Sequence, residues 1–457
     1  MTEDLLLVMK EILTKDLTKG PLWKKILLFS YPLMLSNLLQ VLFNLSDIAV
    51  VGQFAGAYAL GSVGSTTTLV NLFVTFLIGM GCGVNVLVAR FYGSRKAKDV
   101  SETVHSSAII CFLTGVLLMA LGSIFARNIL QLLHTKEELL DGAVLYLRIY
   151  FLGMPATALY NFGNGVLSAV GDTKKPLCYL TWSGVINITL NLIFVIVCNM
   201  GVAGVALASM IAQYVSAVLI VRALLRSEDM YSLRIKSIRL EPRKASMILK
   251  IGIVSGLQNA IFQLANLFVQ VGVNRFDAVM VAGNSAASNA DALVYDVMGA
   301  FYVACSSFIG QNFGAGNKKR VKRTYILCQL YSFGAGILIG VLLALFGRSF
   351  LGIFTGDEAV IDAGMNRLMI MSYSYAFSAF MDCAIAASRG LGKVLFPTVF
   401  VILGSCIFRI IWIYTIFEYF KTIESLYLLY IFSWTITAVA EIIYFVIIYR
   451  KVAFKVN

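Results

Sequence analysis

The sequence predicts an all-α polytopic membrane protein, with twelve transmembrane helices in two pseudo-symmetric six-helix lobes around a central cavity. Composition is the first observation behind this prediction. Hydrophobic residues make up 59% of the 457 residues and charged residues 13%, about half of the ~25% charged content of a typical soluble domain. The second observation is an internal repeat, since landmarks of the first half recur in the second half at a nearly constant distance.

Apolar segments long enough to cross a bilayer, which takes about 20 residues, follow one another along the whole chain. Twelve such segments are present, at 26–52, 60–89, 102–126, 139–170, 176–199, 201–225, 248–275, 282–312, 323–347, 360–388, 395–417 and 425–449. Within them Pro32 and Pro155 predict kinks, because proline removes one helical hydrogen bond.

Basic residues gather in every second loop. Twenty-nine of the 37 lysines and arginines lie in the two termini and in the loops that follow the even-numbered segments. This bias predicts that both termini are cytoplasmic, and it explains the net charge of +13 without nucleic acid as a partner. We therefore expect a multi-pass protein of the cell (inner or plasma) membrane.

The predicted domain organisation follows from these segments. We expect a cytoplasmic tail at 1–22, an amino-terminal lobe at 23–225, a basic loop at 226–247, a carboxy-terminal lobe at 248–450 and a second tail at 451–457.

The repeat has a constant offset. Gly93 and Gly314 are 221 residues apart, and so are the pairs Gly171 and Gly392, and Pro176 and Pro397. Because six crossings separate the copies, both halves have the same orientation. Parallel repeats of this kind are typical of transporters that rock around a central site.

Enzymatic chemistry has little support in the sequence. The eight cysteines lie in apolar runs without a C-x-x-C pair, so we expect small buried residues rather than a disulfide framework or a zinc site. There is no Ser-His-Asp order and no phosphate-binding loop, and no soluble segment is long enough for a nucleotide-binding fold. We expect a protein that is not an enzyme and needs no cofactor.

Acidic residues deep within the segments are few and therefore informative, because a carboxylate there costs about 2.5–3.5 kcal/mol. They are Asp47, Asp291, Asp296, Asp382 and Glu441, and we expect Glu441 to reach water from the end of the last segment.

Asp47 has candidate oxygen partners in other segments. Asn187 and Asn191 share one helix face at i, i+4 spacing, and Ser209 follows in the next segment. A carboxylate among amide and hydroxyl oxygens suits a hard cation or a proton. The alternative is that the two asparagines only join helices through hydrogen bonds.

The second half offers another polar cluster, either a cation site or a wall of the substrate site. It comprises Asp291, Asp296, Asp382, Asn259 and Gln263. Further residues are candidates for lining a cavity, namely Asn161, Asn164, Tyr160, Met298 and Tyr302.

Several motifs together resemble the multidrug and toxic compound extrusion (MATE) family over residues 22–450. They are "LSDIAVVGQFAG", "RFYG" before a basic loop, "GDTKKP", "NITLN", "GVAGVALAS" and "SRGLG", in the order typical of that family. The resemblance implies efflux of organic, often cationic compounds driven by Na+ or H+.

The resemblance also assigns residues of an amino-terminal cation site. Asp47 matches the first-span acid and Asn187 a fifth-span asparagine, while Asn191 stands where relatives have Asp or Asn and Ser209 where some have Thr. Relatives with a carboxy-terminal Na+ site have an acid on the seventh span, where this chain has Gln and Asn. A metal is therefore expected nowhere except for possible Na+ at Asp47.

The sequence thus predicts a secondary active antiporter that functions as a monomer, binds small organic substrates and couples to H+ or Na+. One alternative is a lipid-linked saccharide or lipid flippase, which needs inward-facing basic residues, and only Arg148, Arg367 and Arg409 qualify. A second alternative is a non-transporting membrane receptor or scaffold.

Overall fold

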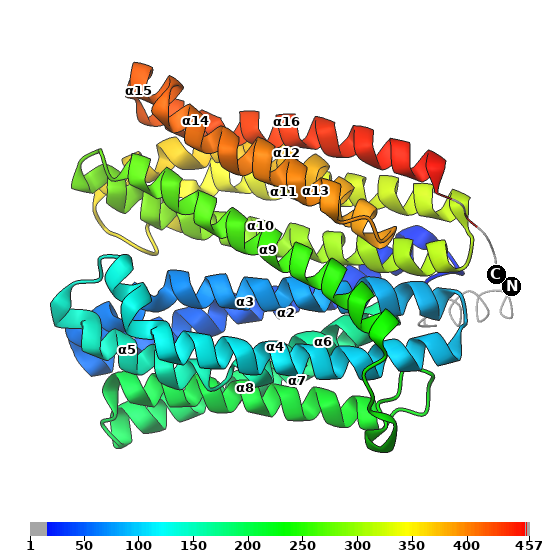
Figure 1. Ribbon diagram of the computed structural model, residues 1–457. Helices are drawn as coiled ribbons and strands as arrows, with labels where there is room; N and C mark the ends of the chain where they lie inside the picture. Colours follow the sequence, from blue (N-terminus) through cyan, green and yellow to red (C-terminus); the bar gives the residue numbers. More distant parts are fainter. Residues whose placement is uncertain (1–15, 453, 455–457) are drawn as a thin grey trace, which may run out of the picture. The chain divides into compact units, whose positions relative to one another are not determined.

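The computed structural model describes residues 16–452 and 454 and consists of helices joined by short loops (Figure 1). The helices of the first half are α2 (Leu22–Val50), η1 (Val51–Ala55), α3 (Gly56–Gly93), α4 (Ala97–Leu132), α5 (Glu137–Phe151), α6 (Met154–Ala169), α7 (Lys174–Leu192), η2 (Ile193–Val197) and α8 (Gly201–Leu225). Those that follow are η3 (Ile235–Ser237), α9 (Pro242–Val273), α10 (Ala278–Gly314), α11 (Lys318–Leu351), α12 (Glu358–Gly390), α13 (Leu395–Val401), η4 (Ile402–Ile407), α14 (Phe408–Tyr414), α15 (Ile416–Phe420) and α16 (Ile423–Lys451).

The described residues contain ten helical stretches long and apolar enough to cross a membrane, or eleven when α5 and α6 count as one span. The first stretch, Leu22–Gly93, has 72 residues. A helix of that length measures about 108 Å, far more than the ~30 Å of one crossing. It turns at Gly56, whose φ of +83° suits glycine, so α2 and α3 are separate spans. With α2 and α3 counted separately and α5 and α6 as one, the described residues give twelve spans, the number that the sequence predicts.

Two predicted spans are interrupted. Residues 139–170 form α5 and α6, which meet at an angle of 46°, and Pro155 lies in the first turn of α6, where its missing N–H costs nothing. Residues 395–417 are divided among α13, η4, α14 and the start of α15. By contrast, Pro32 lies inside α2 without ending it.

The chain forms two compact units whose limits differ from the predicted lobes. We call them the amino-terminal unit (Leu35–Leu257) and the carboxy-terminal unit (Gln258–Asn457 together with residues up to Met34). The difference arises because α2 and α9 each divide between the units. Phe29 of α2, for example, packs edge-on against Phe308 of α10, with ring centres 5.5 Å apart.

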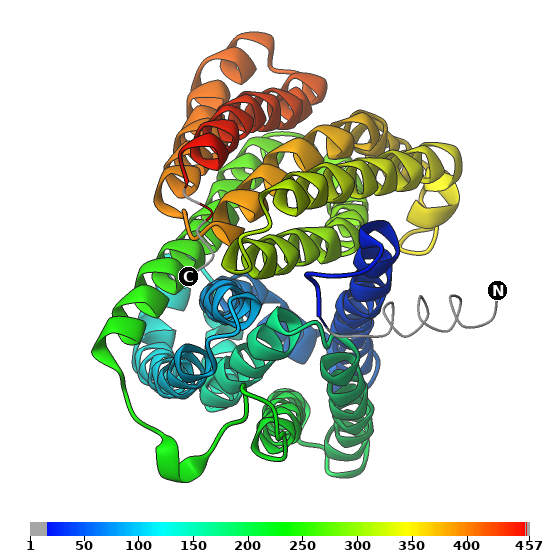
Figure 2. The same ribbon diagram turned by 90° about the vertical axis from the view of Figure 1, so that its right-hand side faces the viewer.

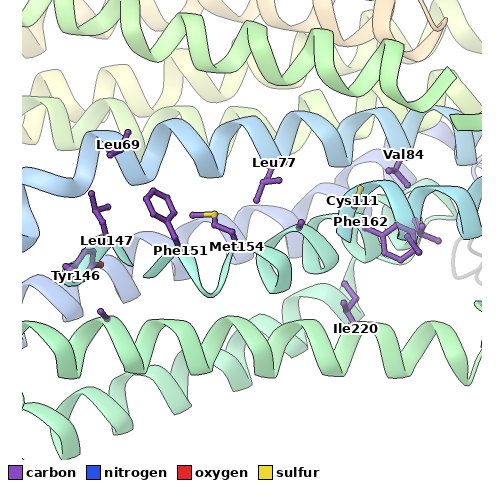
Figure 3. Packing of buried hydrophobic residues seen from close by; sticks show 14 of the residues in the cluster. Leu69, Leu77, Val84, Cys111, Tyr146, Leu147, Phe151, Met154, Phe162 and Ile220 are labelled. Carbon is purple, nitrogen blue, oxygen red and sulfur yellow. The ribbon is translucent and has the colours of Figure 1, made fainter. Parts of the chain in front are cut away.

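Apolar packing defines each unit. The core of the amino-terminal unit draws side chains from α3, α5 and α6, among them Leu77, Phe151 and Phe162 (Figure 3). In the carboxy-terminal unit α10, α11 and α12 contact one another and α12 also contacts α16, as the end-on view of Figure 2 shows. Large apolar side chains also remain on outer helix faces, as expected in lipid.

Ion pairs confirm the repeat at the level of side chains. Arg127 pairs with Asp141 in one unit, and Arg348 pairs with Asp362 in the other. Both partners of the second pair stand 221 residues after those of the first (348 − 127 and 362 − 141). The predicted offset therefore relates equivalent places in the two units.

The prediction that the cysteines are buried holds for only some of them. Five cysteines are buried, but Cys178 and Cys198 are exposed and Cys82 is partly exposed. The prediction of uniform burial was wrong because an apolar run in a membrane helix has a lipid-facing side as well as a core-facing side.

Glycines allow α3 and the first part of α9 to approach closely within the amino-terminal unit. A Cβ atom on Gly79 would lie 2.4 Å from the Cα of Gly256, and one on Gly83 would lie 2.7 Å from the amide nitrogen of Gly252. These spacings of four residues form a small-xxx-small contact on both helices.

We expect Gly79→Ala to lower the thermal stability of the purified protein, because its methyl group would meet backbone atoms that cannot rotate away. Overpacking of this kind costs about 1–3 kcal/mol. The matched control is Gly64→Ala on the same helix, where a Cβ meets nothing within 4 Å. Equal melting temperatures for the two variants would contradict the prediction.

Candidate functional site

Asp47 is held by donors from two other helices of the amino-terminal unit. The Nδ2 of Asn191 on α7 donates to its Oδ1, and the hydroxyl of Ser209 on α8 donates to its Oδ2 at 3.3 Å. Asn187 Nδ2 lies 3.5 Å from the Ser209 hydroxyl oxygen, which accepts its hydrogen bond. The four residues predicted from the sequence therefore form one connected site around the carboxylate of Asp47.

Irregular helix turns adjoin this site. The π-turn η1 begins four residues after Asp47, and the π-turn η2 begins two residues after Asn191. The two π-turns contact each other, and η1 also contacts α8. Such turns change the direction in which side chains project and recur at functional sites.

The site also retains an unused acceptor. The Oδ1 of Asn191 is buried and has no hydrogen-bond partner among the described residues. Asn187, Asn191 and Ser209 are buried, whereas Asp47 is partly accessible. Within residues 16–452 and 454, no group of three or more His, Cys, Asp or Glu side chains is arranged to hold a metal ion.

The other predicted polar residues of this unit bond locally. The Tyr160 hydroxyl donates to the carbonyl of Pro176 at 3.3 Å, and Asn161 donates to the carbonyl of Thr157 at 2.9 Å. Asn164 accepts a hydrogen bond from Ser168 at 3.3 Å. Each contact joins α6 to itself or to the start of α7, and none involves Asp47.

The carboxy-terminal unit contains a cavity of about 440 Å³, which we call the carboxy-terminal pocket. Its walls comprise Phe262, Gln263, Asn266, Val269, Gln270, Val273, Asn284, Ser288, Asp291, Ala292, Tyr295, Asp296, Arg367, Met371, Tyr430 and Trp434. Of the predicted cluster, Asp291, Asp296 and Gln263 line the pocket. Asp382 and Asn259 are not among its lining residues, so the pocket does not unite the whole cluster.

Arg367 occupies one wall of the pocket and forms a buried network. It pairs with Asp291 and donates to Asn284 Oδ1 at 2.7 Å. The Tyr375 hydroxyl also donates to Asp291, while the guanidinium lies over the ring of Tyr427 at 5.3 Å. A buried carboxylate requires such partners. Asp291 is therefore part of an internal ion pair.

A second buried arginine adjoins the same pocket. Arg409 is fully buried, and its Nη1 donates to Asn266 Oδ1 at 2.7 Å. In the sequence we considered Arg367 and Arg409 only as possible flippase residues. The sequence does show that both arginines lie within apolar segments. Because a charge inside a membrane is costly, such a residue is a candidate for a functional role.

Another polar group lies near the end of α12. Arg389 and Thr398 both donate to Gln258 Oε1, at 2.8 and 2.9 Å. Glu441 is 0% exposed, which corrects the expectation that it reaches water. Of the remaining predicted cavity residues, Met298 is fully buried in the apolar core and Tyr302 packs against it.

A sequence model of the MatE family matches residues 32–193 and again residues 255–415. The two matches cover most of the chain, one in each half of the repeat. The chain belongs to the MATE family. It is therefore a multi-pass membrane protein of a family of multidrug efflux transporters with small-molecule substrates, rather than an enzyme.

Individual MATE relatives agree with this assignment. The chain is 29% identical over 366 residues to the probable multidrug resistance protein YpnP of Bacillus subtilis, covering 79% of this chain and 81% of that one. It is 26% identical over 363 residues to the FAD transporter of Shewanella oneidensis, covering 79% and 80%.

Among solved structures, a crystal structure of MATE in the straight conformation matches with a TM-score of 0.89 and 19% sequence identity. The match covers 96% of this chain and 98% of that one. This similarity establishes the fold.

Proposed function

We propose that this protein is a secondary active antiporter that exports organic, often cationic compounds in exchange for H+ or Na+. The single observation that carries this proposal is the Asp47 site. It places one carboxylate within a membrane helix, and the donors that orient this carboxylate come from two other helices. An ionisable residue there is expensive, and function is the usual reason for keeping it.

Alternating access follows if the coupling ion and the substrate favour different arrangements of the protein. Each ligand shifts the population only by its differential affinity for the two arrangements. Protonation of Asp47 would remove its charge and weaken the hydrogen bonds from Asn191 and Ser209. The adjoining π-turns η1 and η2 are the segments that we expect to respond.

The donor set favours H+ over Na+. Asn191 and Ser209 direct an N–H and an O–H group at the Asp47 carboxylate, so both of its oxygens already accept hydrogen bonds. Na+ binding would require the Asn191 amide to rotate so that its oxygen replaces its nitrogen. Proton binding requires only a proton on Asp47.

We further propose that the protein lies in the cell membrane with both termini in the cytoplasm, which the placement of the basic loops supports. Each chain contains both units of the repeat, so we propose that the monomer is the functional form.

The test is ethidium efflux from proteoliposomes with either an imposed pH gradient or an imposed Na+ gradient. We expect the pH gradient to drive efflux and the Na+ gradient to drive little. Efflux driven by Na+ alone would overturn the choice of coupling ion, and the absence of efflux under both gradients would overturn the antiporter proposal for this dye.

A further inference from the structure

Two buried donors beside the carboxy-terminal pocket have no acceptor. The Nη2 of Arg409 and the indole Nε1 of Trp434 are both buried without a hydrogen-bond partner in the part of the chain that the structure describes. The other guanidinium nitrogens of Arg409 donate to Ser433 at 3.3 Å and to Asn266 at 2.7 Å. Leaving a charged donor unsatisfied is costly, so the arrangement is suited to an acceptor that arrives with a ligand.

Trp434 lines the pocket, and Arg409 packs against the rings of its wall. The guanidinium carbon of Arg409 lies 4.7 Å from the ring centre of Tyr430, 5.0 Å from that of Phe262 and 5.8 Å from that of Trp434. All three rings line the pocket, as does Asn266, which accepts from Arg409. Arg409 therefore stands directly behind an aromatic wall, with one hydrogen bond already directed to a lining residue.

The charge of Arg409 lacks an internal counterion. Arg367, the other buried arginine, pairs with Asp291, whereas no carboxylate among the described residues lies within 4.0 Å of Arg409. Its three ring contacts are cation–π interactions, which do not neutralise a formal charge. Asp296 also lines the pocket, and its carboxylate disfavours a second anionic group, so we expect one anionic group per ligand.

The fold itself does not require these charges. At the offset of 221, Arg409 corresponds to Ile188, Arg367 to Tyr146 and Asp291 to Val70. The same helices thus pack in the amino-terminal unit with no charge at these places. Conversely, Asn191 corresponds to Trp412. Duplication supplied the scaffold, and each unit carries its own polar site.

We propose that the carboxy-terminal pocket binds aromatic compounds that carry a carboxylate, whose oxygens accept hydrogen bonds from Arg409 and Trp434. This inference rests on the proposed transport function and adds aromatic carboxylates to the cationic compounds proposed above. The aromatic wall of Phe262, Tyr430 and Trp434 stacks on the ring of the compound. The guanidinium supplies the charge that distinguishes a carboxylate from an amine.

The test is equilibrium binding of two matched probes to the full-length protein in lipid nanodiscs by isothermal titration calorimetry. The probes are 2-naphthoate and 2-naphthylmethylammonium, which share a ring system and differ in charge. We expect Arg409→Gln to weaken 2-naphthoate binding by about tenfold or more, the usual effect of losing a charged hydrogen bond. The amine should bind this variant no more weakly than it binds wild type.

Two further variants keep the result interpretable. Trp434→Phe retains the ring and removes one donor, so it should weaken 2-naphthoate binding even if Arg409→Gln fails to fold. Arg348→Gln replaces an exposed arginine of the same unit and should leave binding unchanged. No gradient is present, so a failure of coupled efflux leaves this measurement unaffected.

Three results would overturn the inference. The first is no binding of 2-naphthoate to wild type. The second is unchanged 2-naphthoate affinity in Trp434→Phe together with unchanged affinity in folded Arg409→Gln. The third is a site that chloride alone occupies and from which 2-naphthoate does not displace it.

Discussion

Asp47→Asn is expected to abolish coupled efflux while leaving the protein folded. Asparagine has nearly the same shape and still accepts a hydrogen bond, but it cannot exchange a proton or carry a negative charge. The coupling free energy, about 1–3 kcal/mol between two linked sites, is then lost, so a gradient should no longer raise the efflux rate above the rate without one. The measurement is the initial rate of ethidium efflux from proteoliposomes, with the melting temperature as the check on folding.

The controls for this result come from the same unit. Asp141→Asn changes an acid whose side chain is 80% exposed and should retain efflux. Ser209→Ala removes the donor to Asp47 Oδ2 and should reduce efflux without abolishing it. Full efflux by folded Asp47→Asn would remove Asp47 from the coupling mechanism, whereas equal losses in Asp47→Asn and Asp141→Asn would point to a general effect of lost charge.

The amino-terminal site could be predicted because one pair of its residues is local and the family resemblance assigned the others. Asn187 and Asn191 stand one helical turn apart, so a single helix face carries both amides. Asp47 is the one acid deep within its span. The family resemblance then related these residues to Ser209, and the structure joins all four by hydrogen bonds.

The carboxy-terminal pocket could not be predicted to the same extent, because its contacts also join helices far apart in the sequence and the family resemblance assigns no residues there. Asp291 and Arg367 are 76 residues apart and Asn266 and Arg409 are 143 residues apart. The sequence shows that each is an intramembrane polar residue but not which partner it has. For the same reason the division of α2 and α9 between the units was missed, since a continuous apolar run carries no mark of the unit that it contacts.

Arg367→Met is expected to destabilise the carboxy-terminal unit strongly. The substitution leaves the carboxylate of Asp291, whose side chain is 18% exposed, without its ion-pair partner. Removing one partner of a buried pair typically costs about 3–5 kcal/mol, because an uncompensated charge remains. For a unit of this size that corresponds to a melting temperature lower by about 10 °C. Thermal unfolding of the detergent-purified protein, followed by the loss of its monodisperse chromatographic peak, measures the change.

The matched control is Arg348→Met on α11, which also removes an arginine that pairs with acidic residues. Its side chain is 56% exposed, so Asp362 and Glu358 remain hydrated when it is lost, and exposed ion pairs contribute little. We therefore expect no measurable change in melting temperature. Combining Arg367→Met with Asp291→Asn should recover part of the lost stability, since the unpaired charge disappears. If the double variant were no more stable than Arg367→Met alone, the loss would come from the packing of the arginine against Tyr427 rather than from its charge.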